Sequence, residues 1–272
     1  MKKKPIVIAI INTKGGGTKT TTSINTASFL SRYENAKVLL IDADPMQSLS
    51  RYSSSYVPAE NGITHVITEQ NFMNSISKWP FDDIDLIYND DSKNHLSDYG
   101  KERLDGAFLM RKALEQMQGE YDYIVIDTTP NDCKMLEMCI VASDLIITPV
   151  VLETLAAREL SRGTLAIIEE CRSAVESISP IPFAKHVGFF VEPKPTNVSK
   201  LVRETVLEDM EGHPHFKLTD YIISYRAAIS EAAAAEVPIF HHKNRTTALI
   251  SSWYEELIPK LLKSVEVLDE RS

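Results

Sequence analysis

"NTKGGGTKTTT", residues 12–22, lies between a short apolar run and a helical pattern. The general phosphate-loop pattern G-x-x-x-x-G-K-[ST] has glycine where this chain has Thr13 and Thr18, but its last two positions are occupied as expected by Lys19 and Thr20. A glycine-rich turn between a strand and a helix directs backbone N–H groups at an anion, and the helix dipole adds to the attraction. The stretch therefore predicts a phosphate-binding loop with an altered pattern.

The residue types of the loop suit a nucleotide and Mg²⁺. Gly15, Gly16 and Gly17 allow close approach of the backbone to phosphate. Lys19 is expected to reach the β- and γ-phosphates, and the Thr20 hydroxyl is expected to ligate Mg²⁺. The alternative is a glycine-rich turn without a ligand, but the Lys-Thr pair at the correct offset favours the phosphate loop.

The altered pattern K-G-G-x-x-K-[ST]-T resembles the deviant phosphate loop of the ParA/MinD family of ATPases. It is matched by Lys14, Gly15, Gly16, Lys19, Thr20 and Thr21. The resemblance implies that Lys14 crosses a dimer interface to the phosphate of the partner's ATP, and that Thr21 contacts the α-phosphate. Without the resemblance, Lys14 would be a solvated loop lysine. Thr18 stands where the family commonly has glycine, so nucleotide affinity is the property that this departure affects.

Two aspartate motifs follow further along the chain. "LLIDADPMQS" places Asp42 and Asp44 at the end of an apolar run, and "YDYIVIDTTP" ends a second run in Asp127. The first resembles the family motif D-x-D-P, which implies that Asp44 prepares the attacking water and that Asp42 lies near the metal. Asp127 has the Walker-B arrangement that holds Mg²⁺. The alternative for Asp42 and Asp44 is capping of the next helix.

Short β-branched runs alternate with longer helical patterns, which predicts an α/β fold: a mostly parallel β-sheet sandwiched by helices, with right-handed crossovers. The expected strands are 6–11, 37–42, 84–88, 123–127, 145–150, 187–191 and 221–224. The expected helices include 20–33, 104–117 and 155–177. The acidic stretch within 82–105 is expected to be a solvated loop. The resemblance narrows this to a P-loop NTPase fold of the deviant Walker A type, as one ATPase domain over 1–272 without a separate helix-turn-helix domain.

Composition limits the function. The 272 residues have 43% hydrophobic and 25% charged content, as in a globular domain, and a formal charge of −9. This charge argues against a surface built entirely for nucleic acid or an anionic membrane, although a local basic patch is compatible with it. The cysteines, Cys133, Cys139 and Cys171, have no paired metal spacing, so reduced thiols are expected.

The resemblance extends over residues 5–262 and narrows to the ParA/Soj branch. It implies that ATP and Mg²⁺ support a homodimer, that this dimer binds DNA without sequence preference, and that a ParB-type partner stimulates slow ATP hydrolysis. The implied role is partition of a plasmid, a chromosome or a mobile element. A cytoplasmic protein that associates with the nucleoid in its ATP state, with no membrane contact, is the expected localisation.

The DNA-binding residues are less clear from the sequence. Basic candidates are Lys200, Arg203, Arg226, Lys243 and Arg245, with Lys217, Lys260 and Lys263 as further members. Glutamates such as Glu204, Glu208 and Glu256 are interleaved with them. A mixed solvated surface is therefore the alternative for each of these cations.

Three rival functions remain to be weighed. A ParA-like ATPase could position a protein cargo instead of DNA, which the sequence does not separate from partition. A MinD-like membrane switch would need a basic amphipathic C-terminal helix, but the last segment carries Glu255, Glu256 and Pro259, so Trp253 and Leu257 are expected to pack in the core. An iron–sulfur carrier would need paired cysteines, and none precedes Cys133.

Overall fold

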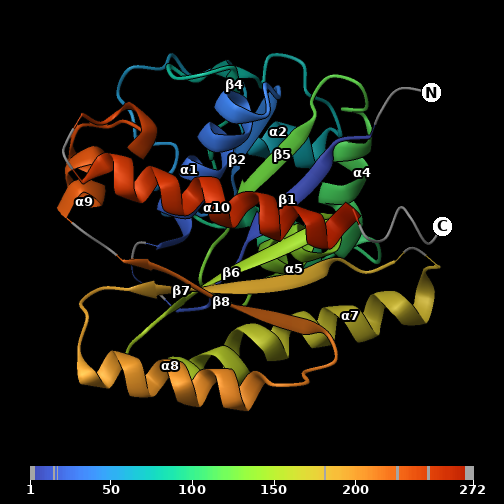
Figure 1. The fold of residues 1–272 in the computed structure, drawn as a ribbon. Coiled ribbons are helices and arrows are strands. Elements are labelled where there is room, and N and C mark those ends of the chain that lie inside the picture. The colour runs from blue at the N-terminus through green and yellow to red at the C-terminus, as the bar shows by residue number, and fades with distance from the viewer. Residues whose placement is uncertain are drawn as a thin grey trace.

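The structure is a computed structural model that describes residues 4–14, 16, 18–180, 182–224, 227–243 and 246–266. Of the side chains within these ranges, those of 156, 157 and 264–266 are not described. Figure 1 shows a twisted central sheet with helices packed on both of its faces. The fold class predicted from the alternating pattern is therefore confirmed.

The strands of the described chain form one eight-stranded sheet in the order β3-β4-β2-β5-β1-β6-β7-β8. Every neighbouring pair is parallel except the short β3, which runs antiparallel to β4. Their bounds are β1 Ile6–Ile10, β2 Val38–Asp42, β3 Ser77–Lys78, β4 Ile84–Ile87, β5 Tyr123–Asp127, β6 Leu145–Val151, β7 Lys185–Glu192 and β8 Phe216–Ser224. The central strands are apolar on consecutive residues because helices cover both faces.

Helices α1, α9 and α10 cover one face of the sheet, and the other helices of the hydrophobic clusters cover the opposite face (Figure 1). The α-helices are α1 Thr18–Tyr33, α2 Ile63–Thr68, α3 His95–Lys101, α4 Leu109–Glu115, α5 Lys134–Ala142, α6 Ala156–Glu159, α7 Ala166–Ile178, α8 Asn197–Met210, α9 Ala227–Ala234 and α10 Thr247–Glu266. The 3₁₀ segments are η1 Gly106–Phe108 and η3 Ile239–His241, and η2 Leu160–Leu165 is a π-helix.

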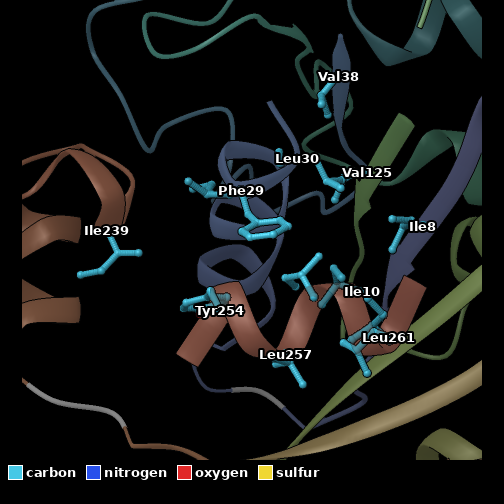
Figure 2. Packing of buried hydrophobic residues seen from close by; sticks show 14 of the residues in the cluster. Ile8, Ile10, Phe29, Leu30, Val38, Val125, Ile239, Tyr254, Leu257 and Leu261 are labelled. Carbon is cyan, nitrogen blue, oxygen red and sulfur yellow. The ribbon is translucent and has the colours of Figure 1, made fainter. Parts of the chain in front are cut away.

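Helix α10 lies against α1 and the sheet rather than projecting from them (Figure 2). Tyr254, Leu257 and Leu261 recur at helical spacing and are buried against Ile10 and Phe29. Leu257 is buried and Trp253 packs against the same cluster, which confirms the core prediction for both residues. The apolar face of this helix is thus already covered by the protein itself. No helix in the described ranges has both the length and the apolar character that a membrane span requires.

The prediction of a solvated loop within 82–105 was wrong. Besides β4, which corresponds to the strand expected over 84–88, the stretch contains the unpredicted helix α3, and Leu96 of α3 is buried in the second hydrophobic cluster. The buried Asp91 carboxylate accepts hydrogen bonds from the backbone N–H groups of His95 at 2.8 Å and Leu96 at 2.7 Å. Here an acidic side chain satisfies the free donors of a helix start, which charge counting alone cannot distinguish from solvation.

The helix expected over 155–177 is interrupted. It consists of α6, the π-helix η2 and α7. The π-helical turn is wider than an α-helical turn and holds about one additional residue. Gly163 lies within η2, where a Cβ would come within 2.4 Å of the Thr13 Oγ1 atom of the phosphate loop. This irregular turn therefore lets the helix approach the loop closely.

His186 of β7 makes the stability of the fold sensitive to acid. Its ring is buried, lies 2.7 Å from Thr148 Oγ1 through Nε2 and packs on Phe216. Burial, with smaller contributions from the charges of Arg172 and His213, lowers the pKa of His186 to about 3. The folded chain thus keeps the ring neutral at a pH where the unfolded chain protonates it.

We expect the free energy of unfolding to fall by about 2 kcal/mol between pH 7 and pH 5 through His186. The sign follows because below pH 6.5, the ordinary pKa of histidine, the unfolded chain binds a proton at His186 that the folded chain does not bind. Lowering the pH therefore favours the unfolded chain. Urea unfolding of the native protein and of His186→Gln measures the difference, with the exposed His95→Gln as the control. An unchanged pH dependence in His186→Gln would contradict this assignment.

Candidate nucleotide-binding site

The predicted motifs meet at the carboxyl edge of the sheet. Ile10, the last residue of β1, is paired in register with Asp127 of β5, and Asp127 is paired with Asp42 of β2. The loop that follows β1 and the two aspartates therefore lie beside one another. The carboxyl ends of parallel strands are where ligands bind in open α/β sheets.

Lys19 is held in the first turn of α1 and is almost completely buried. Among the described residues, its ammonium donates one hydrogen bond, to the Asn12 backbone oxygen at 3.1 Å. Burial is the largest influence on Lys19 and lowers its pKa, although Asp127 and Asp44 oppose the shift. A buried cation with so few partners is suited to an anionic ligand.

Thr20 and Ser23 converge on Asp127 from the same side of α1. The Thr20 hydroxyl donates to Asp127 Oδ2 at 2.7 Å, and the Ser23 hydroxyl lies 3.1 Å from Asp127 Oδ1. Burial, and then the charge of Asp42, raise the pKa of Asp127, against the opposing effects of Thr20 and Lys19. A divalent cation would offset this cost of burying the carboxylate, so Thr20 and Asp127 fit an Mg²⁺ ion.

Asp42 organises the loop after β2. Its Oδ1 atom accepts from the Asp44 N–H at 3.0 Å, and its Oδ2 atom accepts from the N–H and hydroxyl of Ser50 at 2.8 and 2.6 Å. Burial is the main cause that raises the pKa of Asp42, and these hydrogen bonds oppose it. The alternative interpretation, in which Asp42 and Asp44 cap the next helix, was wrong, because α2 begins only at Ile63 and its N-cap Gly62 receives no side-chain hydrogen bond. Asp42 instead holds the turn after β2, and its support of a metal stays a prediction.

Asp44 lies one step further along the same loop. It is buried, its Oδ1 atom accepts from the Met46 N–H at 3.0 Å, and its charge acts on Lys19. This position places a carboxylate near the lysine of the phosphate loop. Its role in preparing water stays a prediction.

Lys14 contacts acidic side chains that follow β6, whereas Lys19 contacts the Asn12 backbone oxygen. Its Nζ atom lies 2.6 Å from Glu153 Oε2 and 3.3 Å from Glu159 Oε2. Burial favours the neutral amine of Lys14, but the hydrogen bonds and charges of the two glutamates outweigh it and raise the pKa. Lys14 is thus a held cation and not the freely solvated lysine of the alternative interpretation.

The start of the loop is tied to the π-helix. The Thr13 N–H donates to Thr164 Oγ1 at 3.1 Å, and the two threonine hydroxyls lie 3.1 Å apart. Asn12 adds a second tie, because its amide donates to the Pro149 oxygen at 2.6 Å and accepts from the Lys14 N–H at 2.8 Å. These contacts tie the loop to β6 and η2.

Of the remaining predicted loop residues, the structure describes Gly16, Thr18 and Thr21. Gly16 has φ +129°, a conformation that favours glycine. Thr18 begins α1, where a β-branched residue is accommodated, and the half-buried Thr21 follows on the same helix. Gly15 and Gly17 lie outside the described residues.

Of the five predicted DNA-binding residues, the three that the structure describes do not gather at one place. Lys200 and Arg203 are on α8, where Arg203 pairs with Asp220. Lys243 is exposed just after η3, beside α9, on the opposite face of the sheet. Arg226 and Arg245 lie outside the described residues. A role in DNA binding stays a prediction for all five.

Several site residues were not predicted from the sequence. They are Asn12, Ser23, Ser50, Asn89, Glu153, Glu159 and Thr164. Ser23 lies one helical turn after Lys19, a spacing that places both on one side of α1 and could have indicated it. The glutamates gave no such signal, because their contact with Lys14 joins positions far apart in the chain.

A loop of this geometry between β1 and α1, with a buried lysine and a threonine that meets the aspartate of a neighbouring strand, defines a P-loop NTPase. A family model described as an AAA domain matches residues 5–178, which is more than half of the chain. The chain belongs to the ParA/MinD family of P-loop ATPases, in its ParA-type branch of partition and positioning ATPases.

Relatives of known name agree with this membership. Maintenance of carboxysome distribution protein A of Synechococcus elongatus is 28% identical, with 77% of this chain and 83% of that protein covered. The sporulation initiation inhibitor protein Soj of Bacillus subtilis is 25% identical, with 88% and 92% covered. The chromosome-partitioning ATPase Soj of Thermus thermophilus is 30% identical over 62% of this chain and 63% of that one.

Solved structures share the fold. The ATP complex of a Cyanothece McdA variant superimposes with a TM-score of 0.81 at 19% identity, covering 96% of this chain and 97% of that one. A putative plasmid partition protein of Borrelia burgdorferi, bound to AMPPNP, gives 0.71 at 23% identity and covers 94% and 99%. These likenesses concern the fold over nearly the whole length of the chain.

Proposed function

We propose that the protein is an ATP-driven switch that forms a homodimer around bound nucleotide, binds DNA without sequence preference and partitions a DNA cargo. A ParB-type partner protein would stimulate its slow hydrolysis of ATP to ADP and phosphate. The observation that carries the proposal is the division of labour between Lys19, buried in its own phosphate loop, and Lys14, turned outward to Glu153 and Glu159. The two lysines thus have separate sets of contacts, which is what separate roles in the two subunits of a dimer would need.

ATP and Mg²⁺ are the proposed cofactors. Bound Mg²⁺ would supply positive charge to the phosphates, with Thr20 and Asp127 as the residues to hold it. Lys19 and the loop amides would bind phosphate, Thr21 would contact the α-phosphate, and Asp44 would orient the attacking water. Lys14 would reach the nucleotide of the partner subunit and stabilise negative charge there.

The outward-facing contact of Lys14 is compatible with this exchange. Both glutamates are more than a third exposed, so each ion pair contributes only about 0–1 kcal/mol. A phosphate group offered by a partner subunit would compete with such weakly held carboxylates. The ion pairs therefore keep Lys14 in place without fixing it there.

Positioning of a protein cargo is the second candidate function. It is favoured by the similarity to the carboxysome distribution protein over 77% of this chain. It would use the same ATP switch and the same association with the nucleoid in the cytoplasm, and differ only in what the partner protein carries. A MinD-like membrane switch has less support, because the apolar face of α10 is packed against α1 and the sheet.

Asp44→Ala should trap the ATP-bound dimer by slowing hydrolysis. Light scattering with ATP and Mg²⁺ should then show a doubling of the 30.5 kDa mass. The variant with both Asp44→Ala and Lys14→Ala is the control and should stay monomeric. Unaltered turnover in Asp44→Ala would remove Asp44 from the mechanism.

The same samples test the DNA step. At low salt, the trapped dimer should co-elute with nonspecific duplex DNA. Added salt should weaken this binding, because the release of counterions from the DNA, which favours binding, contributes less free energy at high salt. Dimerisation without DNA binding would favour the protein-surface alternative. A mass that does not respond to nucleotide would contradict the switch itself.

A further inference from the structure

A pocket with an excess of positive charge lies beside the phosphate loop. It has a volume of about 580 Å³, within the range of about 300–1,000 Å³ that is usual for ligand pockets. The loop and the α6–η2 helix form it with Thr13, Lys14, Arg158, Glu159, Arg162 and Gly163. Among the described residues, Lys19, Thr20 and Asp127 do not line it. The pocket is therefore separate from the groups proposed to hold the nucleotide of the same subunit.

The irregular helix after β6 brings two arginines to this pocket. Arg158 lies in α6 and Arg162 in the π-helix η2, four positions apart, so both lie on one side of the helix. Gly163 lets the helix approach the loop, since a Cβ there would come within 2.4 Å of Thr13 Oγ1. The hydroxyls of Thr13 and Thr164, 3.1 Å apart, hold this approach. The π-helical turn thus places two cations beside the phosphate loop, and such turns frequently lie at functional sites.

The charges of the two arginines are not balanced by acids. Glu153 and Glu159 both pair with Lys14, at 2.6 and 3.3 Å. Arg158 and Arg162 are exposed, and within the described part of the chain neither has an ion-pair partner. Like charges four positions apart destabilise a helix, and the chain has 38 acidic residues against 29 basic ones. Stability therefore gives no reason for this pair of arginines, whereas a ligand with negative charge does.

We propose that Arg158 and Arg162, together with Lys14, bind the phosphates of the nucleotide that the partner subunit holds. This inference rests on the proposed function, in which Lys14 reaches that nucleotide. Because the arginines line the same pocket as Lys14, a phosphate that meets Lys14 lies beside them. A guanidinium offers a planar fork of donors that binds two phosphate oxygens at once, and it stays charged at any pH at which the protein is folded.

The inference changes what one subunit contributes to the other. Lys14 alone would supply one positive charge across the interface, and it would have to leave Glu153 and Glu159 to do so. Arg158 and Arg162 avoid this cost, because no acid among the described residues holds them. Each nucleotide would then be enclosed by cations from both subunits. The dimer should therefore be tighter than Lys14 alone allows, and it should release ATP slowly.

The test compares two variants that lose the same charge. Arg158→Gln with Arg162→Gln removes both arginines from the pocket, and Lys4→Gln with Lys185→Gln removes two lysines at the amino edge of the sheet. Both are made in the Asp44→Ala protein, so that ATP is not consumed. Light scattering on dilution, with ATP and Mg²⁺, measures the dissociation constant of the dimer. It should rise about 10-fold or more in the arginine variant and stay within about twofold in the lysine variant.

The release of ATP identifies what the arginines contact. At a protein concentration that keeps each variant dimeric, radiolabelled ATP is chased with unlabelled ATP, and its release should be about 10-fold faster or more in the arginine variant. Calorimetry should show native affinity of the monomer for ADP, because the arginines do not line the site around Lys19. Arg158→Lys with Arg162→Lys keeps the charge but loses the planar fork, so it should restore part of the dimer affinity and of the slow release.

Native dimer affinity in the arginine variant would overturn the inference. So would a weakened dimer that releases ATP at the native rate, since the arginines would then meet an acidic side chain of the partner subunit and not its nucleotide. A matching loss of ADP affinity in the monomer would also overturn it, because the arginines would then act at the phosphate site of their own subunit.

Failure of the proposed function has a different signature. If the Asp44→Ala protein with both arginines intact forms no ATP-dependent dimer, the switch fails, and this inference fails with it. If that protein dimerises with ATP and the arginine variant dimerises equally well, the switch stands and only the inference fails. Light scattering of the Asp44→Ala protein thus separates the two outcomes.

Discussion

Lys19→Ala should weaken ATP binding by on the order of 10²-fold or more, since removal of one partner of a buried charged contact costs roughly 2–5 kcal/mol. The reason is its burial: the almost completely buried ammonium donates to the Asn12 backbone oxygen, and its charge balances those of Asp127 and Asp44. In the ATP complex this charge would be directed at the phosphates. Calorimetric titration with ATP and Mg²⁺ measures the change.

A surface lysine provides the control for Lys19. Lys112→Ala removes the same charge from α4, where Lys112 pairs with the half-buried Asp105, and should leave ATP affinity unchanged. Circular dichroism should show that Lys19→Ala remains folded, since the alanine is a good helix former in α1. An affinity for ATP close to that of the native protein would exclude Lys19 from the phosphate site.

Lys14→Ala should bind ATP within a few-fold of the native affinity but should form no ATP-dependent dimer. This separation is expected because Lys14 contacts Glu153 and Glu159 and not the groups around Lys19. Stimulated hydrolysis should fall by on the order of 10³-fold, the lower range for a cation supplied in trans. Light scattering and single-turnover hydrolysis measure the two effects.

Lys4→Ala is a matched control for this experiment. Lys4 is also ion-paired, with Asp144 at 2.9 Å, but it lies at the amino end of β1 and away from the nucleotide edge. It should dimerise normally. A Lys14→Ala protein that dimerises as well as Lys4→Ala would show that Lys14 has no role across the interface.

Local pattern was sufficient for most of the fold. The seven expected strands all exist, because a buried parallel strand needs consecutive apolar residues and these runs are short and unmistakable. The prediction also placed Asp42 and Asp127 correctly at the carboxyl ends of two strands, because each apolar run ends at its aspartate. In the structure the two residues are paired in register on neighbouring strands. The two-residue β3 was not predicted, because Ser77 and Lys78 have no such run.

Long-range partners account for what the sequence did not reveal. Asp91 resembles a solvated acid until its two backbone donors are known, and Lys14 resembles a solvated lysine until Glu153 and Glu159 are placed beside it. The π-helix depends on the contact of Gly163 with Thr13, which joins residues far apart in the chain. No periodicity within a short window carries that information.

The positions of two surface lysines have a practical consequence for labelling. The pairing of Lys4 with Asp144 keeps the start of β1 at the amino edge of the sheet, and the last described turns of α10, with Lys263, reach the same edge. A dye attached to either lysine would therefore leave the nucleotide edge clear. Such a labelled protein should turn over ATP like the native one, so a change in its turnover would have to come from elsewhere than a blocked site.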